Sequence, residues 1–181
     1  MARLAYVGSI VADNLRQAMI TSGSYAPRET LRFFPIALTM HNLEAAIWFP
    51  AWSQHAGFWE RPVGATEFRI AAVLLTILAL AITFWSIRSR HESLATYALA
   101  GFLFAILLNV IFHVVATVGL REYAPGVVTG VLINLPVMGY LLRRMFQDKW
   151  VSWPKALGAL IVVPLALLLL IPALLWVGRS I

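Results

Sequence analysis

The chain has 181 residues, of which 61% are hydrophobic and only 12% are charged, and its mean hydropathy is +0.81. This composition is more apolar than a soluble domain needs for one core, and it indicates a polytopic membrane protein. The net charge of +6 does not point to nucleic acid, because the basic residues lie between apolar spans, and the absence of cysteine excludes disulfides, thiolate metal sites and cysteine nucleophiles.

Residues 1–30 contain two short apolar runs among charged residues such as Arg3, Asp13 and Arg16. Neither run is long enough to cross a hydrocarbon core, which takes about 20 residues. We therefore expect an N-terminal arm over 1–30, either an interfacial helix or a loose segment. A single transmembrane domain at 31–181 should follow it.

Five apolar spans follow the arm, each close to the length that crosses a bilayer. Loops rich in glycine, proline or charge separate them. The sequence therefore predicts an all-α fold, a bundle of five transmembrane helices. The spans cover about 31–52, 67–87, 94–120, 125–145 and 154–178.

The distribution of Lys and Arg predicts the orientation, because cytoplasmic loops are enriched in them. If the spans alternate in direction, most of the 14 basic residues fall on one side: Arg3, Arg16, Arg28, Arg32, Arg88, Arg90, Arg143, Arg144, Lys149 and Lys155. The opposite side carries Arg61, Arg69, Arg121 and Arg179. We expect a multi-pass protein of the inner or plasma membrane, with its N-terminus cytoplasmic and its C-terminus outside.

The first span contains a histidine and a glutamate, His41 and Glu44, inside an otherwise apolar segment. A carboxylate at bilayer depth costs a few kcal/mol, roughly 2.5–3.5 for a central Asp, so it is retained where it is paired, neutralised or used. On a helix, a spacing of three residues places both side chains on one face. This pair is the first candidate for a functional site, and the simplest alternative is a protonated Glu44 that only bonds a neighbouring helix.

Polar residues of two other spans lie at a similar depth. Glu44 and His113 are each about six residues from the outer end of their span, roughly 9 Å, and Asn109 lies one turn below His113. Asn134 lies roughly 13 Å from the start of the fourth span. We therefore expect the first, third and fourth spans to surround one polar pocket in the outer half of the bilayer, with the second and fifth as outer walls.

The chain resembles a family of small bacterial membrane proteins named for a His-x-x-Glu-Glu motif. Short motifs in the expected order carry the resemblance over about 31–145: His41-Asn42-Leu43-Glu44, Glu67-Phe68-Arg69, Asn109, His113, Arg121, Tyr123, Pro125 and Gly126. Ala45 stands where the family name requires a second glutamate. The resemblance implies a shared site rather than a known reaction.

Two chemistries fit His41, Glu44 and His113. Two imidazoles and one carboxylate are a ligand set for zinc or non-haem iron, with a further position open for water or substrate. With a metal, the site could catalyse hydrolysis or oxidation of a hydrophobic, lipid-like substrate; without one, the same residues could act as acid and base in its isomerisation or hydrolysis. In either case we expect Asn42, Asn109 and Asn134 to orient the site by hydrogen bonds, and Arg121 and Tyr123 to line its mouth.

Other functions remain open at this point. The same side chains could hold an ion or ligand in a small transporter or binding protein, although the spans show no related halves. The chain could also be an accessory subunit, in which His113 and the asparagines only bond neighbouring helices. The lipid bilayer and a hydrophobic small molecule are the expected partners, and the sequence does not fix the oligomeric state.

Overall fold

The computed structural model describes residues 28–180, in which helices joined by loops are present and no strand occurs. The all-α fold class is therefore confirmed for these residues, whereas nearly all of the predicted arm lies outside them. The elements are a 3-10 helix η1 (Arg28–Arg32), α2 (Phe33–Ser53), α3 (Ala65–Arg88), α4 (Leu94–Leu120), α5 (Val127–Thr129), a π-helix η2 (Gly130–Asn134), α6 (Leu135–Gln147) and α7 (Trp153–Arg179).

Three of these helices, α3, α4 and α7, are long and apolar enough to cross a membrane. The first predicted span corresponds to α2, whose polar residues lower its hydropathy. The fourth corresponds to α5, η2 and α6, which follow one another without a break but are divided by the π-helix. The structure thus supports three membrane-spanning candidates among the described residues.

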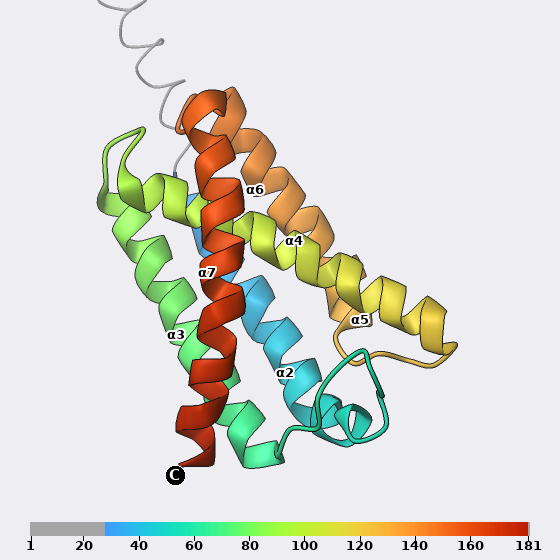
Figure 1. The fold of residues 1–181 in the computed structure, drawn as a ribbon. Coiled ribbons are helices and arrows are strands. Elements are labelled where there is room, and N and C mark those ends of the chain that lie inside the picture. The colour runs from blue at the N-terminus through green and yellow to red at the C-terminus, as the bar shows by residue number, and fades with distance from the viewer. Residues whose placement is uncertain (1–27, 181) are drawn as a thin grey trace, which may run out of the picture. The chain divides into compact units, whose positions relative to one another are not determined.

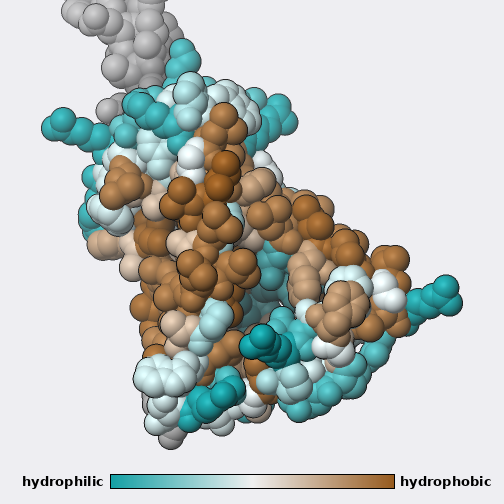
Figure 2. All heavy atoms as spheres, in the orientation of Figure 1, coloured by the Kyte–Doolittle hydropathy of each residue, from teal (hydrophilic) through white to brown (hydrophobic). Residues whose placement is uncertain are grey.

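The helices from α2 onward form one compact unit. In it α7 packs against both α3 and α4, α2 packs against α3, and α4 also packs against α6 (Figure 1). Phe34 of α2 and Phe102 of α4 meet edge to face, with ring centroids 5.1 Å apart, in the larger apolar core. Apolar residues also cover the outer surface of α7, between polar residues at both ends (Figure 2), as expected for a helix that faces lipid.

A close approach of two backbones joins α4 to α7. A Cβ atom on Gly101 would lie 2.5 Å from the carbonyl oxygen of Ala159 and 2.6 Å from Cβ of Val163. Only a residue without a side chain fits there, which is how small residues let membrane helices pack closely.

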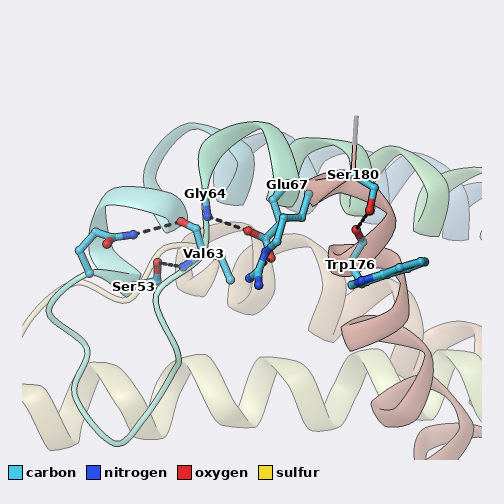
Figure 3. Close-up of polar contacts among 8 residues, drawn as sticks. Ser53, Val63, Gly64, Glu67, Trp176 and Ser180 are labelled. Carbon is cyan, nitrogen blue, oxygen red and sulfur yellow. Dashed lines mark hydrogen bonds and ion pairs between the residues drawn. The ribbon is translucent and has the colours of Figure 1, made fainter.

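A buried carboxylate ties the start of α3 to the end of α7 (Figure 3). Glu67 is 9% exposed; its Oε2 accepts a hydrogen bond from the backbone N–H of Gly64, at 3.3 Å, and its Oε1 accepts one from Arg179, at 2.9 Å. Just before this contact, the backbone N–H of Val63 donates to Ser53 Oγ at the end of α2. Glu67 therefore caps its own helix and forms an ion pair with α7.

Replacing Arg179 with glutamine should lower the free energy of unfolding by about 1 kcal/mol or less, because the Arg179 side chain is 68% exposed and solvent screens its charge, although the Glu67 side chain is only 11% exposed. Thermal unfolding in detergent, followed by tryptophan fluorescence, measures this effect. Arg61→Gln, at an exposed loop arginine, is the matched control and should leave the midpoint unchanged. A loss of several kcal/mol in Arg179→Gln would show that this contact is a main support of the fold.

Candidate functional site

Glu44 of α2 accepts hydrogen bonds from the loop that precedes α5 and from the first turn of α5. Its Oε1 accepts from the Tyr123 hydroxyl and from the backbone N–H of Gly126, the latter at 2.8 Å. Its Oε2 accepts from the backbone N–H of Thr129, also at 2.8 Å. Two oxygens of one carboxylate thus satisfy three donors.

Two of these donors belong to the N-terminus of a helix. Gly126 is the N-cap of α5, with φ +102°, and Thr129 is the last residue of the first turn. The first N–H groups of a helix have no partner within the helix, and the helix dipole favours negative charge there. Glu44 of α2 therefore caps a helix from another part of the chain, which explains how a carboxylate is accommodated in an apolar segment.

Tyr123 lies in the loop between α4 and α5 and is 42% exposed. Two causes raise the pKa of Tyr123 to about 12: mainly the burial of its hydroxyl, and in addition its hydrogen bond to Glu44. The phenol therefore stays protonated at neutral pH and remains a donor to Glu44.

His41 is 3% exposed, and both of its ring nitrogens have partners. Nε2 lies 3.1 Å from the side-chain amide nitrogen of Asn109, and Nδ1 lies 3.2 Å from Oγ1 of Thr129. With the Asn109 amide assigned as the donor, Nε2 accepts and Nδ1–H donates to Thr129. Thr129 also donates its backbone N–H to Glu44, so it bridges the two motif residues.

His113 lies beside His41 but does not share its network. The two ring centroids are 5.2 Å apart, with the rings at 71° to each other. His113 is 3% exposed, and its Nδ1 is buried with no hydrogen-bond partner among residues 28–180. Gly126 lies against both rings, since a Cβ there would be 2.7 Å from His41 Cε1 and 3.0 Å from His113 Nε2.

The π-helix η2 begins directly after Thr129 and ends at Asn134. Pro136 follows at the start of α6 and has no N–H to donate to the preceding turn. We attribute the wider π turn to this proline, and such turns are frequent at functional sites.

The structure brings together His41, Glu44, Asn109 and His113, and it places Tyr123, which was predicted at the mouth, in direct contact with Glu44. They come from α2, α4 and the loop before α5, that is, from the first and third predicted spans and the loop that precedes the fourth.

The hydrogen bonds predicted for Asn42 and Asn134 require correction. Asn42 points toward α3, where its side-chain amide donates to Ala72 O and Thr76 Oγ1, because it lies about 100° around the helix from His41. Asn134 is fully buried, and its side chain has no hydrogen-bond partner among the described residues. Arg121 is an exposed residue that follows α4 as its C-cap, with φ +53°, and its place at the mouth of the site stays a prediction.

The described residues do not support the metal hypothesis. No group of three or more His, Cys, Asp or Glu within 28–180 is arranged to hold a metal ion. Both nitrogens of His41 and both oxygens of Glu44 instead bond protein groups. A metal would have to displace these partners.

Sequence reasoning missed Thr129, which bridges His41 and Glu44. A threonine three residues after a Pro-Gly turn is a weak signal for the first turn of a helix. Ala45, which replaces the second glutamate of the motif, is 4% exposed and lies in a second apolar cluster with Phe49, Trp52 and Ala116. The hydrogen bonds of Glu44 are complete without a carboxylate at position 45.

Residues 32–141 match a family model described as "Protein of unknown function with HXXEE motif". The chain belongs to this HXXEE family. It is 38% identical over 150 residues to "Uncharacterized protein YrkK" of Bacillus subtilis (strain 168), an alignment that covers 82% of this chain and 95% of that protein. No solved structure matches the chain significantly. The His and the first Glu of the motif are His41 and Glu44 in this chain. Their side chains bond residues of α4 and of the start of α5.

Proposed function

We propose that this HXXEE protein is an integral membrane protein with an acid/base site for a hydrophobic, lipid-like substrate, and that His113 is the group that contacts the substrate. The observation that carries this proposal is the buried Nδ1 of His113, which has no partner among the described residues. Buried polar atoms are nearly always paired, by protein, water or ligand. A polar atom of a bound molecule would complete the site.

The neighbouring residues suit a positioning role. His41 and Glu44 are fully bonded, so they hold the first turn of α5 and the Asn109 amide in place rather than offering a free lone pair. The imidazole of His113 can accept a proton at one nitrogen while donating from the other. This makes His113 the best candidate for proton transfer, and the saturation of His41 and Glu44 favours chemistry without a metal.

Two features support access to this site. Tyr123, which bonds Glu44, is 42% exposed. Figure 2 also shows polar residues in a hollow between α7 and the C-terminal half of α4. A lipid-like molecule could therefore approach from the bilayer, with its polar end toward the histidines.

The same proposal includes five membrane crossings. The unbroken stretch 127–147 would be roughly 32 Å long at 1.5 Å per residue, which matches a hydrocarbon core of about 30 Å. The loops between α3 and α4 and between α6 and α7 hold basic residues, including Arg88, Arg90 and Lys149, and they favour a cytoplasmic position for that end. The C-terminus would then lie outside.

Binding without turnover is the second candidate, and the saturated Glu44 favours it, because a carboxylate with three donors is a poor base. Two substitutions separate the candidates. His113→Gln keeps a hydrogen-bonding side chain but cannot act as an acid or base near neutral pH, whereas His113→Phe removes both properties.

The experiment compares the lipid profile of membranes that overproduce each variant, together with molecules retained on the purified protein in native mass spectrometry. For an enzyme, the native protein changes the lipid profile, and His113→Gln lowers that change about 100-fold or more while retaining the bound molecule. His113→Phe should lose both. His55→Ala is the control, because His55 lies in a loop and its side chain pairs with Glu122, away from the histidine pair.

Retention by the native protein and His113→Gln, with no change in lipid profile for any variant, would establish binding without turnover. If His113→Phe retains the molecule and any lipid change as the native protein does, the proposed role of His113 is wrong. Unfolding midpoints of all variants show whether a loss reflects misfolding.

A further inference from the structure

A shallow, open groove of about 230 Å³ lies on the surface of α3, away from the histidines, between the side chains of Arg69, Ile70, Val73 and Leu74. Its apolar residues follow one side of the helix at spacings of three and four. Arg69 is the fifth residue of α3, roughly 6 Å from its start, and Leu74 lies roughly 8 Å further along. The exposed lining of the groove is entirely apolar, and Arg69 contributes only apolar atoms to it.

Arg69 has an uncompensated charge. Its side chain is exposed and its Nε donates to the backbone carbonyl of Ala46 in α2, at 3.2 Å, and it forms no ion pair within residues 28–180. The bond to Ala46 fixes the base of the guanidinium. The remaining N–H donors are available to an anion, for which the planar guanidinium is well suited.

The groove is separate from the His41–Glu44 site because α2 lies between them. Asn42 of α2 bonds Ala72 and Thr76 on α3, whereas His41 and Glu44 bond residues of α4 and α5. A molecule in the groove would therefore contact neither histidine.

We propose that this groove binds one anionic phospholipid, with its phosphate on Arg69 and an acyl chain along Ile70, Val73 and Leu74. In α3, a helix long and apolar enough to cross a bilayer, Arg69 lies near one end, where headgroups lie, and Val73 is 58% exposed at acyl-chain depth. The exposed Arg69 and the apolar groove beside it match the two parts of such a lipid.

The test measures retention of phosphatidylglycerol and of phosphatidylcholine with the same acyl chains by native mass spectrometry of the purified full-length protein. Arg69→Gln should lower the affinity for phosphatidylglycerol about fivefold, since one arginine near anionic lipid has about this effect, and should leave phosphatidylcholine unchanged. Arg69→Lys should keep most of the preference. Arg61→Gln, at an exposed arginine in the loop before α3, is the charge control.

A second substitution tests the apolar part of the groove. Val73→Trp fills the groove but keeps Arg69, so it should lower retention of both lipids, whereas Val162→Trp on the exposed face of α7 should not. Soluble glycerol phosphate, which has the headgroup charge but no chains, should not displace the lipid.

The proposal fails if Arg69→Gln and Arg61→Gln reduce the preference for phosphatidylglycerol equally, because the effect would then be one of general charge. It also fails if glycerol phosphate competes, which would identify a free-phosphate site. A change from oligomer to monomer in Val73→Trp, without loss of lipid, would show that a second copy of the chain occupies the groove.

Discussion

Replacing Glu44 with glutamine is expected to speed amide hydrogen exchange in the segment 124–131 by roughly 30- to 150-fold, which corresponds to the loss of about 2–3 kcal/mol of local stability. Glu44 accepts from the backbone N–H groups of Gly126 and Thr129 and from the Tyr123 hydroxyl. A glutamine side chain has one accepting oxygen, and its amide group is a donor. At least one N–H at the start of α5 therefore loses its acceptor and faces another donor.

The measurement is hydrogen exchange of the protein in nanodiscs, read by mass spectrometry of peptides that cover 124–131. Glu122→Gln is the matched control, because Glu122 is a neighbouring exposed carboxylate that pairs with His55 and accepts nothing from α5. Its exchange should equal that of the native protein. Equal exchange in Glu44→Gln would mean that Glu44 does not cap this helix.

The long helices could be predicted because hydropathy and end signals agree. The third span was expected at 94–120, and α4 covers the same residues. Ser93 forms its N-cap, with its side chain accepting from the backbone N–H of Thr96. Short basic or glycine-containing loops leave little freedom in where such apolar helices begin and end.

The depth of each residue along its helix predicts which main site residues meet. The direction of each side chain also depends on its position around the helix axis. Residues His41 and Glu44 face α4 and α5, as their spacing of three predicts. The same geometry turns Asn42 toward α3. At Asn134, the π-helix inserts extra residues into a turn, so α-helical spacing no longer gives the direction of the side chain.

Two of the three donors to Glu44 could not be predicted from the pattern of side chains in the sequence. These two donors are the backbone N–H groups of Gly126 and Thr129, and every residue except proline has such a group. They become a binding site for a carboxylate only because the chain starts a helix at that point, close to α2. Thr129 was missed for the same reason, since its role follows from this placement and not from any motif.

Replacing Gly126 with alanine is expected to give a larger effect, a loss of about 3 kcal/mol or more in the free energy of unfolding, from two separate causes. The backbone φ of +102° is strained for any residue with a side chain. The added Cβ would also lie 2.7 Å from His41 Cε1 and 3.0 Å from both Cε1 and Nε2 of His113. Neither imidazole can move freely, because both are buried.

Unfolding midpoints in detergent test this expectation against two other glycines. Gly57→Ala shares a positive φ, +63°, but has no atom within 4 Å of the new Cβ, so it measures backbone strain alone. Gly139→Ala lies in α6 in open space and should stabilise the protein by up to about 1 kcal/mol, because alanine favours helix. If Gly126→Ala loses no more than Gly57→Ala, the two histidines are not packed against this turn. A greater loss means that the start of α5 and the imidazole pair form one structural unit, so that whatever binds His113 also acts on the helix that Glu44 caps.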